Sequence, residues 1–111
     1  MTTSGVGIFG TGARSKILIA LSALGESHAP ELARLLGLGV TTTRNALDTL
    51  ERAGLVVGIM KGNTRRVQLN PRFTALTELK ALLDKLLVTD PALLTALAGM
   101  RRRPRRMGKE L

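Results

Sequence analysis

The sequence lacks the residues on which several classes of site depend. It contains no cysteine, no tryptophan and no tyrosine, with only two phenylalanines and one histidine. The absence of cysteine excludes disulfide bonds and thiolate metal sites. The near absence of aromatic rings disfavours a protein that binds single strands or RNA by stacking bases on them. A lone histidine, His28, with no acidic cluster beside it does not make a metal site, so we expect no metal and no other cofactor.

Combinations of residues that carry catalysis are also missing. Serines, threonines and carboxylates are scattered along the chain with no base placed to activate them, so we do not expect an enzyme. No apolar run approaches the roughly 20 residues of a membrane span. The first residues, MTTSGVGIFG, have neither the basic nor the apolar region of a signal peptide. These absences predict a cytoplasmic protein that works by binding and does not contact a membrane.

Positive charge, by contrast, is abundant. There are 17 Lys and Arg against 8 Asp and Glu, and the net charge is +9. Residues 101–111 hold six basic residues and one acidic residue, so this tail carries more than half of the excess. Such a balance favours a polyanionic partner, nucleic acid first. A chain of 111 residues is expected to form one domain with a small aliphatic core.

Apolar spacing and turn signals predict five helices and one hairpin. We expect helices at residues 13–24, 28–36, 40–53, 73–88 and 91–100, and strands at 55–61 and 64–69. Ser27 is the expected N-cap of the second helix, and Gly54 is expected to stop the third. Gly62-Asn63 suits a type II′ turn between the strands.

This order of elements predicts a mainly α fold with a small β-hairpin wing (α+β), a winged helix-turn-helix with additional C-terminal helices. We expect a flexible arm at residues 1–12, a DNA-binding winged helix at 13–70, C-terminal helices at 71–100 and a basic tail at 101–111. A protein with two short helices and a basic ribbon can press one helix into a DNA major groove and lay the ribbon beside it.

The helix expected at residues 40–53 has one apolar side, formed by Thr43, Leu47 and Leu50, and one polar side. The polar side is short near its N-terminal end, where a recognition helix touches base edges. Asparagine there can pair with adenine, arginine with guanine, and threonine with phosphate or a thymine methyl group. The expected DNA contacts from this helix are Thr41, Thr42, Arg44, Asn45 and, on phosphate, Arg52. An ordinary solvated face is the alternative.

Two further basic segments are candidates for the DNA backbone. At the hairpin tip, Lys61, Asn63, Arg65 and Arg66 suit phosphates or a minor groove, although charges on an edge strand can also serve only to block aggregation. In the tail, Arg101, Arg102 and Arg103 begin a run that resembles a nucleic-acid-binding arm, with a solvated tail as the alternative.

A leucine seam runs along the helix expected at 73–88. Leu76, Leu79, Leu83 and Leu86 are spaced as in a coiled coil. The seam either packs on the first helix of the same chain or pairs with the seam of a second chain. We favour the homodimer, because this helix has more apolar surface than one side can hide.

The blocks PELARLLGLGVTTTRNALDTLERAGLV and KGNTRRVQLNP carry a resemblance to known families. Residues 13–69 resemble the winged helix of bacterial and archaeal regulators near the ArsR-type repressors. With Ile8-Phe9-Gly10 before the first helix and Asn70-Pro71 after the wing, they look still more like the winged-helix segment fused to small nucleotidyltransferase domains. The ArsR likeness implies a dimeric repressor that binds operator DNA through the helix at 40–53.

Two departures limit what the resemblance implies. Metal-sensing ArsR-type proteins carry cysteine in the helix that matches residues 30–36, and this chain has none. The Gly-Ser motif and paired aspartates of a nucleotidyltransferase are absent as well. We therefore expect neither metal sensing nor nucleotide transfer.

The sequence as a whole predicts a homodimeric transcriptional regulator, a repressor, that binds double-stranded DNA at a specific sequence. Two alternatives stay open. The winged helix can instead be a protein-interaction module, or the basic tail can drive DNA binding that is indifferent to sequence.

Overall fold

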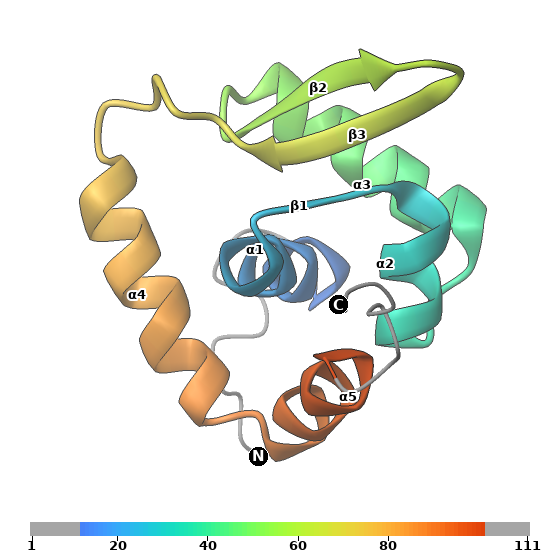
Figure 1. Ribbon diagram of the computed structural model, residues 1–111. Coiled ribbons are helices and arrows are strands. Elements are labelled where there is room, and N and C mark those ends of the chain that lie inside the picture. Colours follow the sequence, from blue (N-terminus) through green and yellow to red (C-terminus); the bar gives the residue numbers. More distant parts are fainter. Residues whose placement is uncertain (1–11, 102–111) are drawn as a thin grey trace, which may run out of the picture.

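The computed structural model describes residues 12–101, which form five helices and a three-stranded antiparallel sheet (Figure 1). This arrangement confirms the predicted fold class. In chain order the elements are α1 (Gly12–Leu24), β1 (Glu26–Ser27), α2 (Ala29–Leu36), α3 (Val40–Arg52), β2 (Val56–Lys61), β3 (Thr64–Leu69), α4 (Leu76–Val88) and α5 (Pro91–Arg101). No helix within residues 12–101 is long and apolar enough to cross a membrane.

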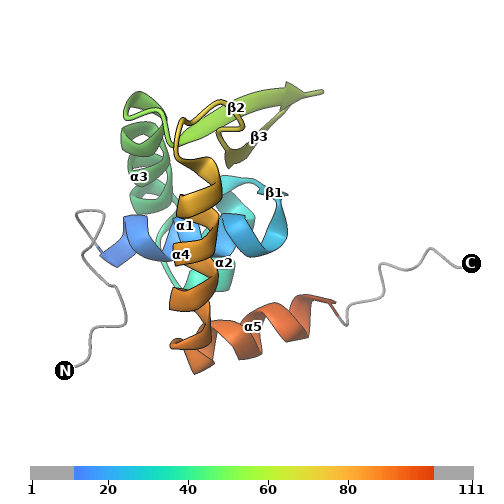
Figure 2. The same ribbon diagram turned by 90° about the vertical axis from the view of Figure 1, so that its left-hand side faces the viewer.

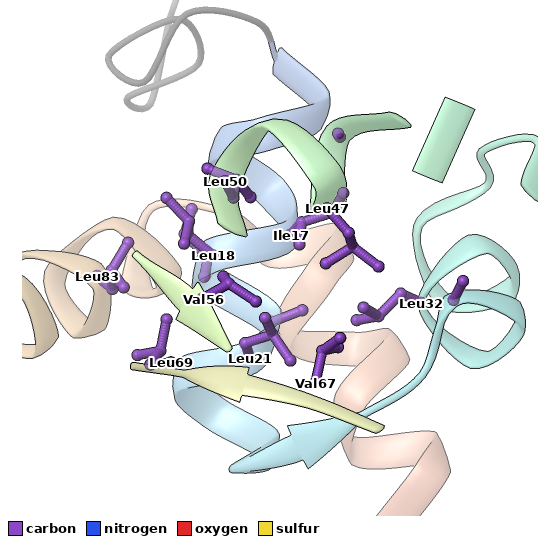
Figure 3. Packing of buried hydrophobic residues seen from close by; sticks show 14 of the residues in the cluster. Ile17, Leu18, Leu21, Leu32, Leu47, Leu50, Val56, Val67, Leu69 and Leu83 are labelled. Carbon is purple, nitrogen blue, oxygen red and sulfur yellow. The ribbon is translucent and has the colours of Figure 1, made fainter. Parts of the chain in front are cut away.

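Helix α1 lies at the centre of the molecule, with the sheet on one side, α4 flanking it and α5 at the end opposite the sheet (Figures 1 and 2). Five consecutive residues from Ile17 to Leu21 are each at most 3 % exposed. Side chains from α2, α3, α4 and the sheet converge on them in one cluster (Figure 3). A helix that is enclosed on all sides has no need of an amphipathic stripe, which explains the nearly continuous apolar run in its sequence.

The region between α1 and α2 differs from the expectation in two respects. Residues Glu26 and Ser27 form a short third strand, which pairs with Gln68 and Val67 of β3. His28, rather than Ser27, is the N-cap of α2: its Nδ1 accepts a hydrogen bond of 3.1 Å from the Glu31 N–H. Ser27 is held in the strand, so its hydroxyl donates to the Glu31 carboxylate instead of capping the backbone.

Helix α3 and the hairpin lie where the sequence places them. The predicted inner side of α3 is buried, with Thr43, Leu47 and Leu50 at most 2 % exposed. The Thr43 hydroxyl donates to the Gly39 carbonyl oxygen at 2.9 Å, so its burial leaves no polar group unsatisfied. Gly54 follows α3 at a φ of +83°, and Gly62 at the hairpin tip has a φ of +64°, a conformation that glycine adopts without strain.

Helix α4 begins at Leu76, three residues later than expected. The side chain of Asn70 stops the strand and organises a turn: its Oδ1 accepts from the Arg72 N–H and its Nδ2 donates to the Gly54 carbonyl, both at 2.9 Å. The Asn70 carbonyl also accepts from the Phe73 N–H. These local bonds compete with the helix, so residues 71–75 remain outside it.

The leucine seam of α4 packs inside its own chain. Leu79 and Leu83 are 7 % and 0 % exposed, and both belong to the core cluster around α1. Leu76 and Leu86 are half-buried against the same cluster. The expected dimer contact is therefore corrected for Leu79 and Leu83, which have no free surface to offer a second chain. The exposed leucine of α4 is Leu82, at 39 %.

Helix α5 is joined to α1 by an ion pair between Lys16 Nζ and Asp90 Oδ2 at 2.9 Å. The Asp90 carboxylate also accepts from the Leu93 N–H at the start of α5. Burial acts to raise the pKa of Asp90, but the hydrogen bonds from Lys16 and Leu93, together with the Lys16 charge, outweigh it and lower the pKa below its ordinary value. Asp90 thus caps α5 and fastens it to the central helix.

We expect Leu83→Ala to reduce the free energy of unfolding by about 2–5 kcal/mol, because it leaves a cavity beside α1. Leu82→Ala, one position along the same helix but on its exposed side, should cost less than about 1 kcal/mol. Chemical denaturation of both variants measures the difference. Equal losses would contradict this packing of α4.

We expect the acid stability of the protein to depend on Asp90. Because the pKa of Asp90 is lowered by folding, its contribution is present above the ordinary pKa and is lost as the pH falls from about 5 through the lowered value. Asp90→Asn keeps a capping side chain but cannot ionise, so its unfolding free energy should change less with pH over this range. Lys16→Gln should flatten the profile in the same way, and denaturation curves that match wild type would contradict the assignment.

Candidate nucleic-acid interface

The first turns of α3 present four of the predicted contact residues to solvent. Thr41, Thr42, Arg44 and Asn45 are all exposed, whereas the opposite side of the helix forms part of the core. Gly37, in the left-handed conformation with a φ of +69°, ends α2 and turns the chain toward α3. The buried side therefore holds the helix in place, and the exposed side is free to contact another molecule.

A groove between the start of α2, α3 and the wing brings together residues that are distant in the sequence. It is lined by Arg44 from α3, by Asn63 and Arg65 from the wing, and by His28 and Pro30 from the start of α2. Three of the predicted contact residues, Arg44, Asn63 and Arg65, thus share one concave surface. This placement puts Arg44 on the side of α3 that faces the wing.

A second groove lies on the other side of α3, where the helix meets the start of α1. Thr42, Asn45 and Thr49 line it together with Ala13 and Arg14. The Thr49 hydroxyl is used within the helix, since it donates to the Asn45 carbonyl at 3.1 Å. The exposed face of α3 is therefore a ridge between two grooves, and Asn45 lies on the side away from the wing.

The wing itself is a two-stranded ribbon whose two faces carry different basic residues. Register pairs Met60 with Arg65 and Ile59 with Arg66, so Arg65 lies on the face that continues from buried Val67, while Arg66 lies on the other face. Figure 2 shows that α3 and the ribbon occupy the same end of the molecule. The inner face of the wing thus faces α3, and the outer face points away from it.

On the inner face, Arg65 contacts two carboxylates of α3. Its Nη1 lies 3.3 Å from Asp48 Oδ1, and its Nη2 donates a short hydrogen bond to Glu51 Oε1. The sequence pattern indicated no role for Asp48 or Glu51. The alternation of strand residues could have suggested this contact, because it places Arg65 on the core side of the ribbon.

On the outer face, a single acid holds the other two cations of the wing. Lys61 Nζ lies 3.1 Å from Glu26 Oε2, and Arg66 Nε lies 3.9 Å from the same oxygen. Glu26 belongs to β1, the strand that sequence reasoning missed, so this contact could not have been found without it. All three basic residues of the wing are therefore in ion pairs, and the wing is less positive than its sequence indicates.

The two arginines of α3 differ from those of the wing. Neither Arg44 nor Arg52 forms an ion pair with any residue in the described part of the chain. Both are exposed, and Arg52 has a long contact of 3.5 Å to the Thr49 hydroxyl. Their positive charges are thus available to an incoming anion.

The remaining predicted contacts belong to the tail. Arg101 is the last residue of α5, one residue beyond the predicted helix end. Arg102 and Arg103 lie outside the described residues, as do residues 1–11 of the arm predicted at 1–12, whereas Gly12 is the first residue of α1. Among residues 12–101, no group of three or more histidine and carboxylate side chains could hold a metal ion.

Comparison with known proteins agrees with this geometry. Residues 15–58, from α1 into β2, match the IclR helix-turn-helix domain. That match supports a helix-turn-helix DNA-binding protein. It covers less than half of the chain and is of the IclR rather than the ArsR type, so the finer resemblance to ArsR repressors is not confirmed. No curated protein sequence matches the chain.

Two solved structures share the fold. The YusO protein from Bacillus subtilis has a TM-score of 0.56 and 17% sequence identity, over 87% of this chain and 64% of its own. The MarR family transcriptional regulator SPO1453 from Silicibacter pomeroyi DSS-3 has a TM-score of 0.55 and 19% identity, over 86% of this chain and 67% of its own. This chain therefore spans about two thirds of the length of either protein.

Proposed function

We propose that the protein is a homodimeric transcriptional regulator, a repressor, that reads a specific sequence in double-stranded DNA. The observation that carries the proposal is the two-sided α3, whose exposed first turns hold Thr41, Thr42, Arg44 and Asn45 while its other side is locked into the core. A rigid helix with short polar residues and an unpaired arginine suits base edges in a major groove. The shared fold with SPO1453, a transcriptional regulator of the MarR family, also supports this role.

The ion pairs of the wing refine which cations contact the DNA backbone. Lys61 and Arg66 share one carboxylate, Glu26, so neither charge is fully neutralised by it. Exposed ion pairs contribute only about 0.2–1 kcal/mol each, and phosphates can replace such a carboxylate. We assign Lys61, Asn63 and Arg66 to the flanking backbone and Arg52 to a phosphate further along α3.

Dimerisation is assigned to the surface of the C-terminal helices that the core leaves exposed. The large apolar residues there are Leu82 and Val88 of α4, at 39 % and 72 % exposed, and Leu94 of α5, at 41 %. Exposed apolar side chains on neighbouring helices are common in subunit interfaces. A two-fold dimer would present two α3 helices to two half-sites of a palindromic operator in the cytoplasm.

A second candidate function is DNA binding without sequence preference, driven by the tail. The ion pairs of the wing favour this function, because they reduce the positive charge that the wing can offer to DNA. Residues 101–111 are the densest group of basic residues in the sequence. A protein-interaction module is the third candidate, with α4 and α5 as its surface. A selection of bound DNA fragments separates all three.

Selection of bound fragments from random double-stranded DNA at about 150 mM salt, where phosphate-only binding is weak, tests the proposal. We expect a two-fold-symmetric motif whose half-site spacing is set by the dimer. Binding without a motif, abolished by deletion of residues 101–111, would replace the proposal with the tail-driven candidate. No binding at all would favour the protein-interaction module.

Single substitutions distinguish the proposed role of α3, the reading helix, from that of the wing. Arg44→Ala should cost about 1–3 kcal/mol on the selected sequence and relax the preference at one base pair. Arg66→Ala should weaken binding to all sequences alike and reduce the slope of log affinity against log salt by about 1. Fluorescence anisotropy on selected and random duplexes measures both, and identical behaviour of the two variants would contradict the assignment.

A further inference from the structure

We propose that Arg65 is a positioning residue, which fixes the wing against the reading helix through Asp48 and Glu51, and not a contact to the DNA backbone. This inference rests on the proposed function and concerns the same surface. It reassigns the one wing cation that points toward α3. The two roles predict different effects on sequence preference, salt dependence and the mobility of the wing.

The contact joins the wing directly to the reading helix. Arg65 reaches from β3 to α3, where Asp48 Oδ1 lies 3.3 Å from its Nη1 and Glu51 Oε1 accepts from its Nη2. Asp48 and Glu51 are three residues apart and so lie on the same side of the helix. A planar guanidinium with donors on two nitrogens can engage both carboxylates at once, which a lysine could not do in the same geometry.

Gly58 of β2 makes room for this arrangement. A Cβ atom at position 58 would lie 3.2 Å from Arg65 Nε and 3.5 Å from Glu51 Oε1. Any other residue there would press on the Arg65 guanidinium, whereas its contact with the Glu51 carboxylate would be an ordinary van der Waals contact. The register pairs Gly58 with Val67, so the glycine lies on the inner face of the wing, beside Arg65.

Charge balance argues against a phosphate contact for Arg65. If its guanidinium moved to a phosphate, Asp48 and Glu51 would be left unpaired next to a polyanion, and both like-charge contacts would oppose binding. Arg65 is the only partner of these two carboxylates among the ion pairs of residues 12–101. While Arg65 stays between them, it offsets one of the two negative charges, and the wing stays attached to α3.

The outer face provides a matched control. Arg66 is the next residue of the same strand, but it points to the opposite side, and its nearest carboxylate oxygen is 3.9 Å away. It lies at nearly the same distance from the tip of the wing as Arg65 and carries the same charge. The comparison of positions 65 and 66 therefore isolates the effect of the carboxylates on α3.

A charge-reversal cycle in the full chain tests the proposal. In a background of Asp48→Asn, the cycle comprises Arg65→Glu, Glu51→Arg and the two together. Arg65→Ala and Arg66→Ala are measured alongside, each as a single substitution in the wild-type chain. The first readout is the ratio of affinities for the selected and random duplexes. The second is the slope of log affinity against log salt, and the third is amide hydrogen exchange of residues 56–69 compared with α1.

We expect each single reversal to lower the affinity ratio about two- to tenfold and to speed exchange in the wing, because like charges then face each other. The double reversal should restore both, since it rebuilds the ion pair in the opposite sense. Arg65→Ala should leave the salt slope unchanged, whereas Arg66→Ala should reduce it by about 1.

Three results would overturn the proposal. They are a lower salt slope for Arg65→Ala, an unreduced affinity ratio for Glu51→Arg, and no rescue by the double reversal. If the wild-type protein shows no sequence preference, the proposed function fails, but hydrogen exchange still decides the role of Arg65. Rescue of wing protection supports the positioning role there too, and its absence refutes it.

Discussion

The burial of α1 is the constraint on which the rest of the structure depends. Five consecutive side chains, Ile17 to Leu21, are enclosed by α2, α3, α4 and the sheet. The leucines and isoleucines among them each contribute about 1.5–3 kcal/mol when fully buried. Helices α2, α3 and α4 and the strand β3 are placed by how they cover this helix. Helix α3 packs Leu47 and Leu50 against it, and α4 packs Leu79 and Leu83 against it. The orientation of α3 and the site on its outer side follow from this packing.

Ion pairs provide a second set of stabilising contacts, on the outer side of α3. The wing is a small ribbon whose buried apolar residues, Val56, Val67 and Leu69, all lie at the end away from its tip, whereas Ile59 and Met60 are exposed. Ion pairs to Asp48 and Glu51 on one face and to Glu26 on the other join it to the body. The net charge of the chain therefore overstates the positive charge of the surface formed by α3 and the wing, where Arg44 and Arg52 are the arginines without an ion pair in the described residues.

Much of this could be predicted from the sequence, and the failures have physical causes. The buried and exposed sides of α3 followed from helical periodicity, because Thr43, Leu47 and Leu50 recur at the right spacing. His28 is the N-cap of α2 because Ser27 pairs with β3 instead. The strand that contains Ser27 is too short to show an alternating pattern in the sequence. The seam of α4 could equally have faced another chain; its burial depends on α1, which local spacing does not encode. The ion-pair partners of the wing are likewise distant in the sequence. Lys61 is 35 residues from its partner, and Arg65 is 17 and 14 residues from its two partners.

The division of α3 into two sides has a consequence for how such a protein can change over generations. The residues that secure the helix, such as Leu47 and Leu50, are different from those that face outward, such as Arg44 and Asn45. Substitutions on the outer side leave the core intact and are close to neutral for folding. Natural variation can therefore change the surface that Thr41, Arg44 and Asn45 present without first acquiring compensating stability elsewhere. Asp48 and Glu51 are exceptions on that side, because a change at either also alters the contact with Arg65 of the wing.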